Sequence, residues 1–211
     1  AYVTTDAAVA PTALRKALQT AVGGSFNAIT VDSDMSTSDT VVLMASGRAG
    51  NQPVSSNSRE YAKLLAMVRE VCESLAYQIV ADGEGMTKVV EVRVEHARND
   101  RDAELAAKSV ANSPLFKCAM HGGDPNWGRI AAAAGKSSAR VDQDELQIRI
   151  GGVLLFSKGA PRRFDEAKVV EHLKGRNVLV EVDLHLGEGS FTAWTCDLSH
   201  EYVTINAEYH T

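Results

Sequence analysis

The chain has 211 residues, of which 45% are hydrophobic and 23% are charged, so it can bury a sizeable core in one large or two small domains. Its formal net charge of -5 argues against nucleic acid or an anionic membrane as a partner, because both select clusters of Lys and Arg. No apolar stretch is long enough to span a bilayer, and the first residues lack the pattern of a secretion signal, so we expect a cytoplasmic protein.

Two amphipathic helices are predicted in the first half of the chain. Residues 11–22 repeat apolar side chains at helical spacing, with Pro11 at the start and glycines directly after the end. A longer helix is expected to follow Asn57, where Glu60 completes a capping box, and to run toward Gly83.

Strand patterns alternate with these helices. Residues 40–45 form a short apolar run, which predicts a strand in the centre of a sheet, covered on both faces. Residues 88–96 alternate valines with charged residues, as a strand with one solvent-facing side does.

The second half predicts a hairpin, a helix and further strands. The hairpin joins residues 146–150 to 153–156 through Gly151 and Gly152, and Asp165 is expected to cap the helix that follows. The remaining strands are expected near residues 178–186, 191–196 and 202–206. The whole pattern indicates a layered α/β or α+β fold, with a sub-boundary near residues 135–145 before a smaller C-terminal part.

The cysteines and histidines do not indicate a metal site. Cys72, Cys118 and Cys196 are odd in number and far apart, so we expect three buried, unpaired thiols. The six histidines lack the spacing of zinc ligands. We therefore expect no metal ion.

Candidate chemistry lies in polar loops, since a packed core has no use for such residues. Residues 32–41 are rich in Ser, Thr and Asp and are interpreted as a turn, in which Asp39 would need partners if it is buried. Glu84 lies between two glycines, so its carboxylate either projects toward a ligand amine or simply belongs to a solvated loop.

Two further stretches are distinctive. In residues 121–130, a pair between Asp124 and Arg129 with a packed Trp127 is expected to brace the loop rather than to bind a ligand. At the C-terminus, Asn206 and Thr211 belong either to a strand end and a tail or to a binding site.

Together these stretches resemble the β chain of the ornithine acetyltransferase family, and the resemblance runs from the first residue to the last. The shared motifs, in chain order, are Thr4-Thr5-Asp6-Ala7, Ser25-Phe26-Asn27, Ser36-Thr37-Ser38-Asp39-Thr40, Gly83-Glu84-Gly85, Asp124-Pro125-Asn126-Trp127-Gly128-Arg129 and Ile205-Asn206-Ala207-Glu208-Tyr209-His210-Thr211. Each motif alone is weak evidence, but their order makes the resemblance specific.

The resemblance implies the layered sandwich of N-terminal-nucleophile type and a precursor that cleaves itself before a threonine. It also implies an α chain from the same precursor, an α2β2 assembly, and transfer of acetyl from N2-acetylornithine to glutamate through an acetyl-threonine, in arginine biosynthesis. Because an acetyl ester on threonine carries the group between the two substrates, the resemblance implies no cofactor, although some members also use acetyl-CoA. The family β chain begins Thr-Met-Leu ahead of the position of Ala1, so no catalytic residue is expected in this chain and the nucleophile is expected just upstream. Thr4 and Thr5 match a later motif and do not replace it.

The resemblance also implies that Glu84, Asn206 and Thr211 contact the amino-acid substrate. Three other functions stay open: a related autoprocessed aminopeptidase, a paralogue in secondary metabolism with another acceptor, and a binding module without activity. The Gly-Glu-Gly and C-terminal motifs favour the acetyltransferase.

Overall fold

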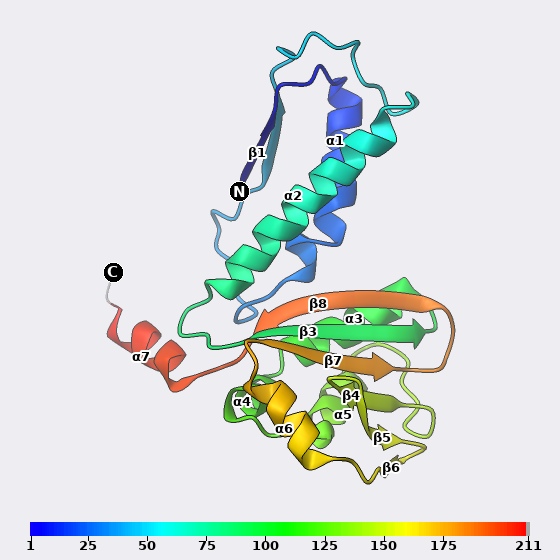
Figure 1. The fold of residues 1–211 in the computed structure, drawn as a ribbon, viewed down its shortest axis with the longest axis vertical. Coiled ribbons are helices and arrows are strands. Elements are labelled where there is room, and N and C mark those ends of the chain that lie inside the picture. The colour runs from blue at the N-terminus through cyan, green and yellow to red at the C-terminus, as the bar shows by residue number, and fades with distance from the viewer. Residues whose placement is uncertain (210–211) are drawn as a thin grey trace. The chain divides into compact units, whose positions relative to one another are not determined.

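The computed structural model describes residues 1–209 and divides the chain into two compact units (Figure 1). The first unit comprises residues 1–29 and 34–79. The second comprises residues 30–33 and everything described from residue 80 onward. The sub-boundary expected near residues 135–145 falls inside the second unit, whereas the packing divides near residue 80.

The first unit is built on a small parallel sheet. Strand β1 (Tyr2–Thr5) pairs with β2 (Val42–Ala45), and helix α1 (Pro11–Gly23) lies in the connection between them. The short 3-10 turn η1 (Phe26–Ala28) and the long helix α2 (Tyr61–Ala81) complete the unit. Its hydrophobic core is formed by Val3, Ala13, Ala17, Ala21, Leu43, Val54, Tyr61, Leu64, Val68 and Cys72.

Helix α1 confirms the first helix prediction, with Pro11 in the first turn. Its fully buried positions are the alanines at 13, 17 and 21, while Leu14 and Leu18 pack partly buried beside them. Small side chains on the inner face allow a close approach between the helix and its neighbours.

Two predictions for this unit are wrong in detail. Helix α2 begins at Tyr61, because residues 55–60 fold into turns in which Ser58 N–H bonds to Ser55 and Tyr61 N–H bonds to Ser58, so the capping box at Asn57 does not form. Strand β2 is not central: it belongs to a two-stranded sheet, and only Leu43 is buried. A short apolar run cannot distinguish a central strand from an edge strand without its partners.

The second unit contains a six-stranded mixed sheet in the order β6-β5-β4-β7-β3-β8. The strands are β3 (Val89–Ala97), β4 (Gln147–Ile150), β5 (Val153–Ser157), β6 (Ala160–Pro161), β7 (Asn177–Asp183) and β8 (Gly189–Cys196). Strands β3 and β7 are parallel, and all other pairs in this sheet are antiparallel.

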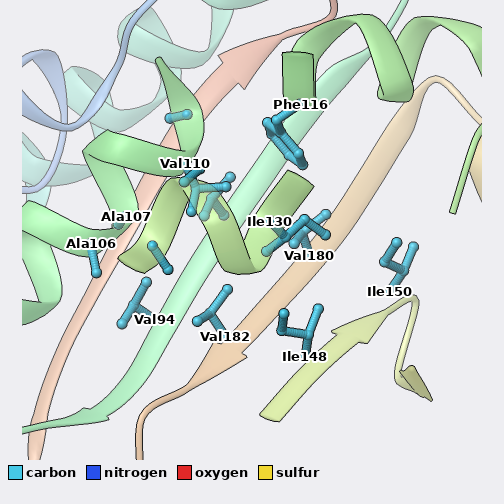
Figure 2. Close-up of a cluster of buried hydrophobic side chains, with 14 of the residues drawn as sticks. Val94, Ala106, Ala107, Val110, Phe116, Ile130, Ile148, Ile150, Val180 and Val182 are labelled. Atoms are coloured by element: carbon cyan, nitrogen blue, oxygen red, sulfur yellow. The ribbon is translucent and has the colours of Figure 1, made fainter. Parts of the chain in front are cut away.

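One face of this sheet carries the main core (Figure 2). Val90, Val92 and Val94 of β3 are completely buried, as the alternation in residues 88–96 predicts. They pack with β7, β4 and the alanine-rich helices α3 (Asp100–Ala111) and α5 (Trp127–Gly135), and helix α4 (Pro114–Gly122) adds Phe116.

The predicted hairpin and its capped helix are confirmed. Gly151 and Gly152 join β4 to β5 with φ of 57° and 75°, the left-handed conformation that such a turn requires. Helix α6 (Glu166–Lys174) begins where the Asp165 side chain accepts a hydrogen bond from Lys168 N–H.

The strand predicted at residues 202–206 is wrong. These residues belong to helix α7 (His200–Glu208), which begins at an N-cap serine, Ser199. The sequence Tyr-Val-Thr-Ile has strand propensity, but here the Ser199 cap, which accepts from two N–H groups of the first turn, outweighs that propensity.

The cysteines and the possibility of a membrane span are also addressed by the sequence. Cys118 is exposed, which corrects the expectation of three buried thiols, while Cys72 and Cys196 are buried. Within residues 1–209 no helix has the length and apolarity to cross a membrane.

Candidate functional site

The Gly83-Glu84-Gly85 loop connects α2 to β3 and is shaped by a glycine requirement. Gly85 has a φ of 63°, and a Cβ atom there would lie 2.5 Å from the backbone nitrogen of Tyr202. Only glycine lets the loop approach the first turn of α7 so closely. The unusual backbone expected around Glu84 is therefore confirmed at Gly85.

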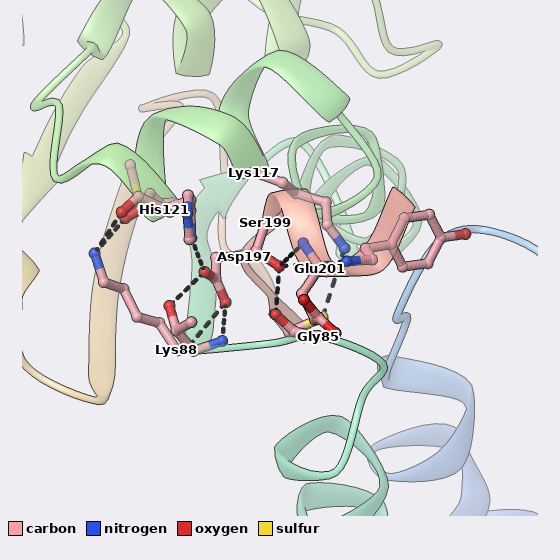
Figure 3. Close-up of polar contacts among 11 residues, drawn as sticks. Gly85, Lys88, Lys117, His121, Asp197, Ser199 and Glu201 are labelled. Atoms are coloured by element: carbon pink, nitrogen blue, oxygen red, sulfur yellow. Dashed lines mark hydrogen bonds and ion pairs between the residues drawn. The ribbon is translucent and has the colours of Figure 1, made fainter. Parts of the chain in front are cut away.

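Ser199 joins this loop to α7. Its hydroxyl accepts hydrogen bonds from the N–H groups of Glu201 and Tyr202, and it donates a short hydrogen bond to the carbonyl oxygen of Gly85 (Figure 3). Ser199 is itself buried, so these three hydrogen bonds, called the Ser199 joint below, are shielded from water. The start of α7 and the loop that carries Glu84 are thus held as one element.

Glu84 and Asn206 lie side by side, although 122 residues separate them in sequence. The Asn206 amide donates to the Glu84 carboxylate over 2.6 Å, and also to the carbonyl oxygen of Tyr202 over 3.0 Å. Both side chains are exposed. Two of the three residues implied by the resemblance therefore form one polar, solvent-facing pair. The third, Thr211, lies outside the described residues.

Asp197 anchors the other end of the loop. Its buried carboxylate accepts hydrogen bonds from Thr87 N–H (2.7 Å), Lys88 N–H (2.8 Å), the Thr87 hydroxyl (2.6 Å) and the His121 ring (2.7 Å) (Figure 3). Burial alone would raise its pKa, but these hydrogen bonds outweigh burial and hold the pKa of Asp197 below its usual range. An ionised Asp197 fixes the chain directly after Gly85.

Two lysines complete the surroundings. Lys88 donates to the carbonyl oxygens of Met120 and His121 at the end of α4, and burial lowers its pKa although Asp197 acts in the opposite direction. Lys117 is only 3% exposed and donates to the carbonyl oxygen of Val31, with the Thr195 hydroxyl 3.3 Å away. These cations hold backbone carbonyls in place and do not point to a separate ligand.

The loop at residues 121–130 serves as a brace, but not through the expected pair. Asn126 caps α5 by accepting from Arg129 N–H, and its amide donates to Asp124. Arg129 donates to the carbonyl oxygen of Leu115, and Trp127 stacks on Phe156 with 4.9 Å between ring centroids. The Asp124–Arg129 pair expected from the sequence is replaced by these contacts.

The acidic loop at residues 32–41 is a turn, as interpreted from the sequence. Asp39 is exposed and accepts a hydrogen bond from Ser36 N–H, so its carboxylate does not face a core. Asp32 differs, because its carboxylate accepts a hydrogen bond from the Tyr202 hydroxyl of α7.

Sequence reasoning missed Asp197 and Ser199, and it included Asp32 only as part of the polar stretch 32–41, without a role of its own. A serine followed two residues later by a glutamate is a recognisable helix start, so Ser199 could have been found. Asp197 and Asp32 gain their importance from contacts with distant parts of the chain, which no local pattern reveals. Within residues 1–209 no group of three His, Cys, Asp or Glu side chains could hold a metal ion.

Comparison with known families decides the chain's affiliation. The model of the ArgJ family matches residues 1–211. The chain belongs to the ArgJ family. Its mixed α/β fold agrees with a solved ArgJ structure, that of the arginine biosynthesis bifunctional protein from Bacillus halodurans. That structure has a TM-score of 0.95 and 42% identity, over 99% of this chain and 98% of the other.

Curated ArgJ relatives are similar along the whole of this chain. The arginine biosynthesis bifunctional proteins of Geobacillus kaustophilus and Zymomonas mobilis are 45% and 48% identical over 100% of it, and that of Geobacter sulfurreducens is 49% identical. This ArgJ chain spans about half the length of these relatives, 52% of the first two and 54% of the third.

Proposed function

We propose that this chain is the β chain of an ArgJ acetyltransferase that moves an acetyl group from N2-acetylornithine to glutamate in arginine biosynthesis. The observation that carries the proposal is the Glu84–Asn206 pair, a carboxylate and an amide held together on a solvent-facing surface. Relatives named as bifunctional proteins of arginine biosynthesis support it. Because the resemblance implies that some family members also use acetyl-CoA, the proposal includes acetyl-CoA as a second acetyl donor.

The proposed chemistry requires a nucleophile, which the resemblance places just upstream of Ala1. In the proposal, a threonine ahead of Ala1 is freed by self-cleavage of the precursor, and its α-amine serves as the base for its own hydroxyl. The hydroxyl attacks the acetyl carbonyl of N2-acetylornithine, ornithine leaves, and the amine of glutamate then attacks the acetyl ester. The α chain completes an α2β2 enzyme in the cytoplasm and supplies the oxyanion donors.

Glu84 and Asn206 suit the recognition of amino acids. A carboxylate pairs with an ammonium group, and an amide can donate to a carboxylate while accepting from an amine. Asn206 N–H orients Glu84 before a substrate arrives, so the carboxylate does not have to be fixed at the moment of binding. Thr211 is proposed as a third contact on the grounds of the resemblance alone.

The test is the intact mass of the complete protein incubated with N2-acetylornithine and no glutamate. We expect a β chain that begins with threonine to gain one acetyl group and to lose it when glutamate is added. Hydrolysis of short peptides without any gain of acetyl would instead favour the aminopeptidase.

A variant tests the role of Glu84. Glu84→Gln keeps the shape but removes the charge, so we expect kcat/KM with both amino-acid substrates to fall about 30-fold, as loss of a charge-assisted hydrogen bond implies. Because Glu84 is exposed, the melting temperature should stay within about 2 °C of wild type. Asp82→Asn changes another exposed carboxylate two residues away and serves as the matched control. Equal kinetics for the Glu84 and Asp82 variants would contradict the assignment.

A further inference from the structure

Helix α7 is held in an unusual way for a helix that carries a binding residue. None of its residues is buried, and Val203 and Ile205 are exposed. In contrast, α3 and α5 bury several apolar side chains against the sheet. The place of α7 on the second unit therefore depends on individual polar contacts rather than on a packed face.

One of these contacts reaches a distant part of the chain. The Tyr202 hydroxyl, near the start of α7, donates to the Asp32 carboxylate over 3.0 Å. The two residues are 170 positions apart, and the contact is partly buried. It is a charge-assisted hydrogen bond, the kind that contributes most per contact.

Asp32 is a firm point of attachment because its own segment is anchored to the sheet unit. Thr30 N–H donates to the Trp194 carbonyl of β8 over 2.9 Å, and the Thr30 hydroxyl donates to the Asn112 side chain over 2.6 Å. The next residue, Val31, receives a hydrogen bond from the buried ammonium of Lys117. Three anchors within two residues leave Asp32 little freedom to move.

The contact between Tyr202 and Asp32 also affects Asn206, which lies one helical turn after Tyr202. Asn206 donates to the carbonyl oxygen of Tyr202 as well as to Glu84, so the position of Tyr202 bears directly on the orientation of the amide. The Ser199 joint fixes the first turn of α7, and the hydroxyl of Tyr202 fixes the rotation of the helix about that joint.

We propose that Asp32 and Tyr202 are positioning residues, which hold α7 so that Asn206 and Glu84 present one preformed amino-acid-binding pair. This inference rests on the proposed function for the meaning of that pair. Neither residue needs to touch the substrate. Their loss should therefore weaken amino-acid binding while the acetyl chemistry proceeds once a substrate is bound.

The kinetic test uses the complete self-processed enzyme and variants that separate shape from hydrogen bonding. Tyr202→Phe removes only the donor, and Asp32→Ala removes the acceptor. We expect each to raise KM for glutamate and for N2-acetylornithine about 10-fold, with kcat within about 2-fold of wild type. Asp32→Asn keeps an acceptor oxygen and should rescue most of the loss. The double variant Asp32→Ala/Tyr202→Phe should be no worse than either single variant.

A second measurement does not depend on activity. Hydrogen–deuterium exchange in residues 203–208 should speed up in Tyr202→Phe and Asp32→Ala, with exchange in β3 and β7 unchanged. Thr204→Ala is the matched control, since the Thr204 hydroxyl bonds within α7, to the carbonyl of His200. It should change neither exchange nor KM.

The outcomes separate the two proposals. If wild type transfers acetyl but Tyr202→Phe leaves KM unchanged, or if Asp32→Asn is as impaired as Asp32→Ala, the positioning role is refuted and the acetyltransferase stands. If exchange in α7 does not change, the positioning role is likewise refuted. If wild type forms no acetyl-enzyme, the proposed function itself fails, whatever the exchange data show about the contact.

Discussion

At the scale of the residue, Asp197 contributes more than any local pattern suggests. One buried carboxylate satisfies two backbone N–H groups, a hydroxyl and an imidazole, so it joins β3, α4 and the end of β8. Replacing it with Asn removes the charge and mismatches one oxygen with an NH2 group. We expect Asp197→Asn to destabilise the protein by about 2–4 kcal/mol at neutral pH.

The stability that the Asp197 carboxylate contributes should decrease as the pH falls. Because the folded pKa of Asp197 lies below its usual value, its stabilisation is complete above the unfolded pKa of about 3.9 and is lost as the pH falls through the folded pKa. The gap in melting temperature between wild type and Asp197→Asn should therefore stay constant from pH 7 to 5 and narrow below pH 4, as measured by calorimetry. A gap that widens on acidification would show that the carboxylate is not held ionised.

How far single residues were predictable depends on whether their role is local. The resemblance identified Glu84 and Asn206, but only the fold shows that they meet, since a separation of 122 residues is closed by the docking of α7. No local pattern marks Asp197, because a lone aspartate after a strand has many ordinary roles. Asp165 was predicted correctly because a cap is a contact between close neighbours.

At the scale of the element, the contact between the Glu84 loop and α7 depends on Gly85. An alanine there would combine a left-handed backbone with a Cβ atom 2.5 Å from Tyr202 N and 2.8 Å from the Glu201 carbonyl carbon. We expect Gly85→Ala to displace α7, to speed up exchange in residues 203–208, and to raise KM for the two proposed amino-acid substrates at least 10-fold.

A second glycine provides the control for backbone strain. Gly123 has nearly the same φ, 67° against 63°, but a Cβ atom at Gly123 would have no other atom within 4 Å. Gly123→Ala should cost only the roughly 1–2 kcal/mol of a left-handed alanine and leave α7 exchange unchanged. If both variants affect α7 equally, the effect is general destabilisation and not the close approach of the loop.

Elements were predictable where the periodicity was long or where the partner was local. Helix α1, strand β3 and the hairpin of β4 and β5 follow from spacing and turn glycines. The sequence predicts a central strand at β2 and a strand at α7, and both predictions are wrong because each segment is too short for its pattern to decide. In both cases the surroundings determine the outcome: β1 is the only partner of β2 in its two-stranded sheet, and Ser199 caps α7.

At the scale of the molecule, the two-unit division could not be predicted from the chain order. The chain passes from the first unit into the second at residue 30, returns to the first at residue 34, and enters the second again at residue 80. It therefore crosses the boundary three times. The parallel pairing of β3 with β7 is equally non-local, since it joins residues 89–95 to 177–183. Sequence patterns describe segments, whereas these features arise from which segments pair.

The buried thiols allow the two units to be followed separately. Cys72 lies in the core of the first unit and Cys196 in the second, and burial raises the pKa of both thiols. Because only the thiolate reacts, each should be alkylated only when its unit opens, whereas exposed Cys118 should react first. The first unit has a two-stranded sheet and the smaller core, so Cys72 should lose protection at a lower urea concentration than Cys196. Pulsed alkylation with peptide mass spectrometry measures both in one sample, and simultaneous exposure of the two thiols would show that the units unfold as one.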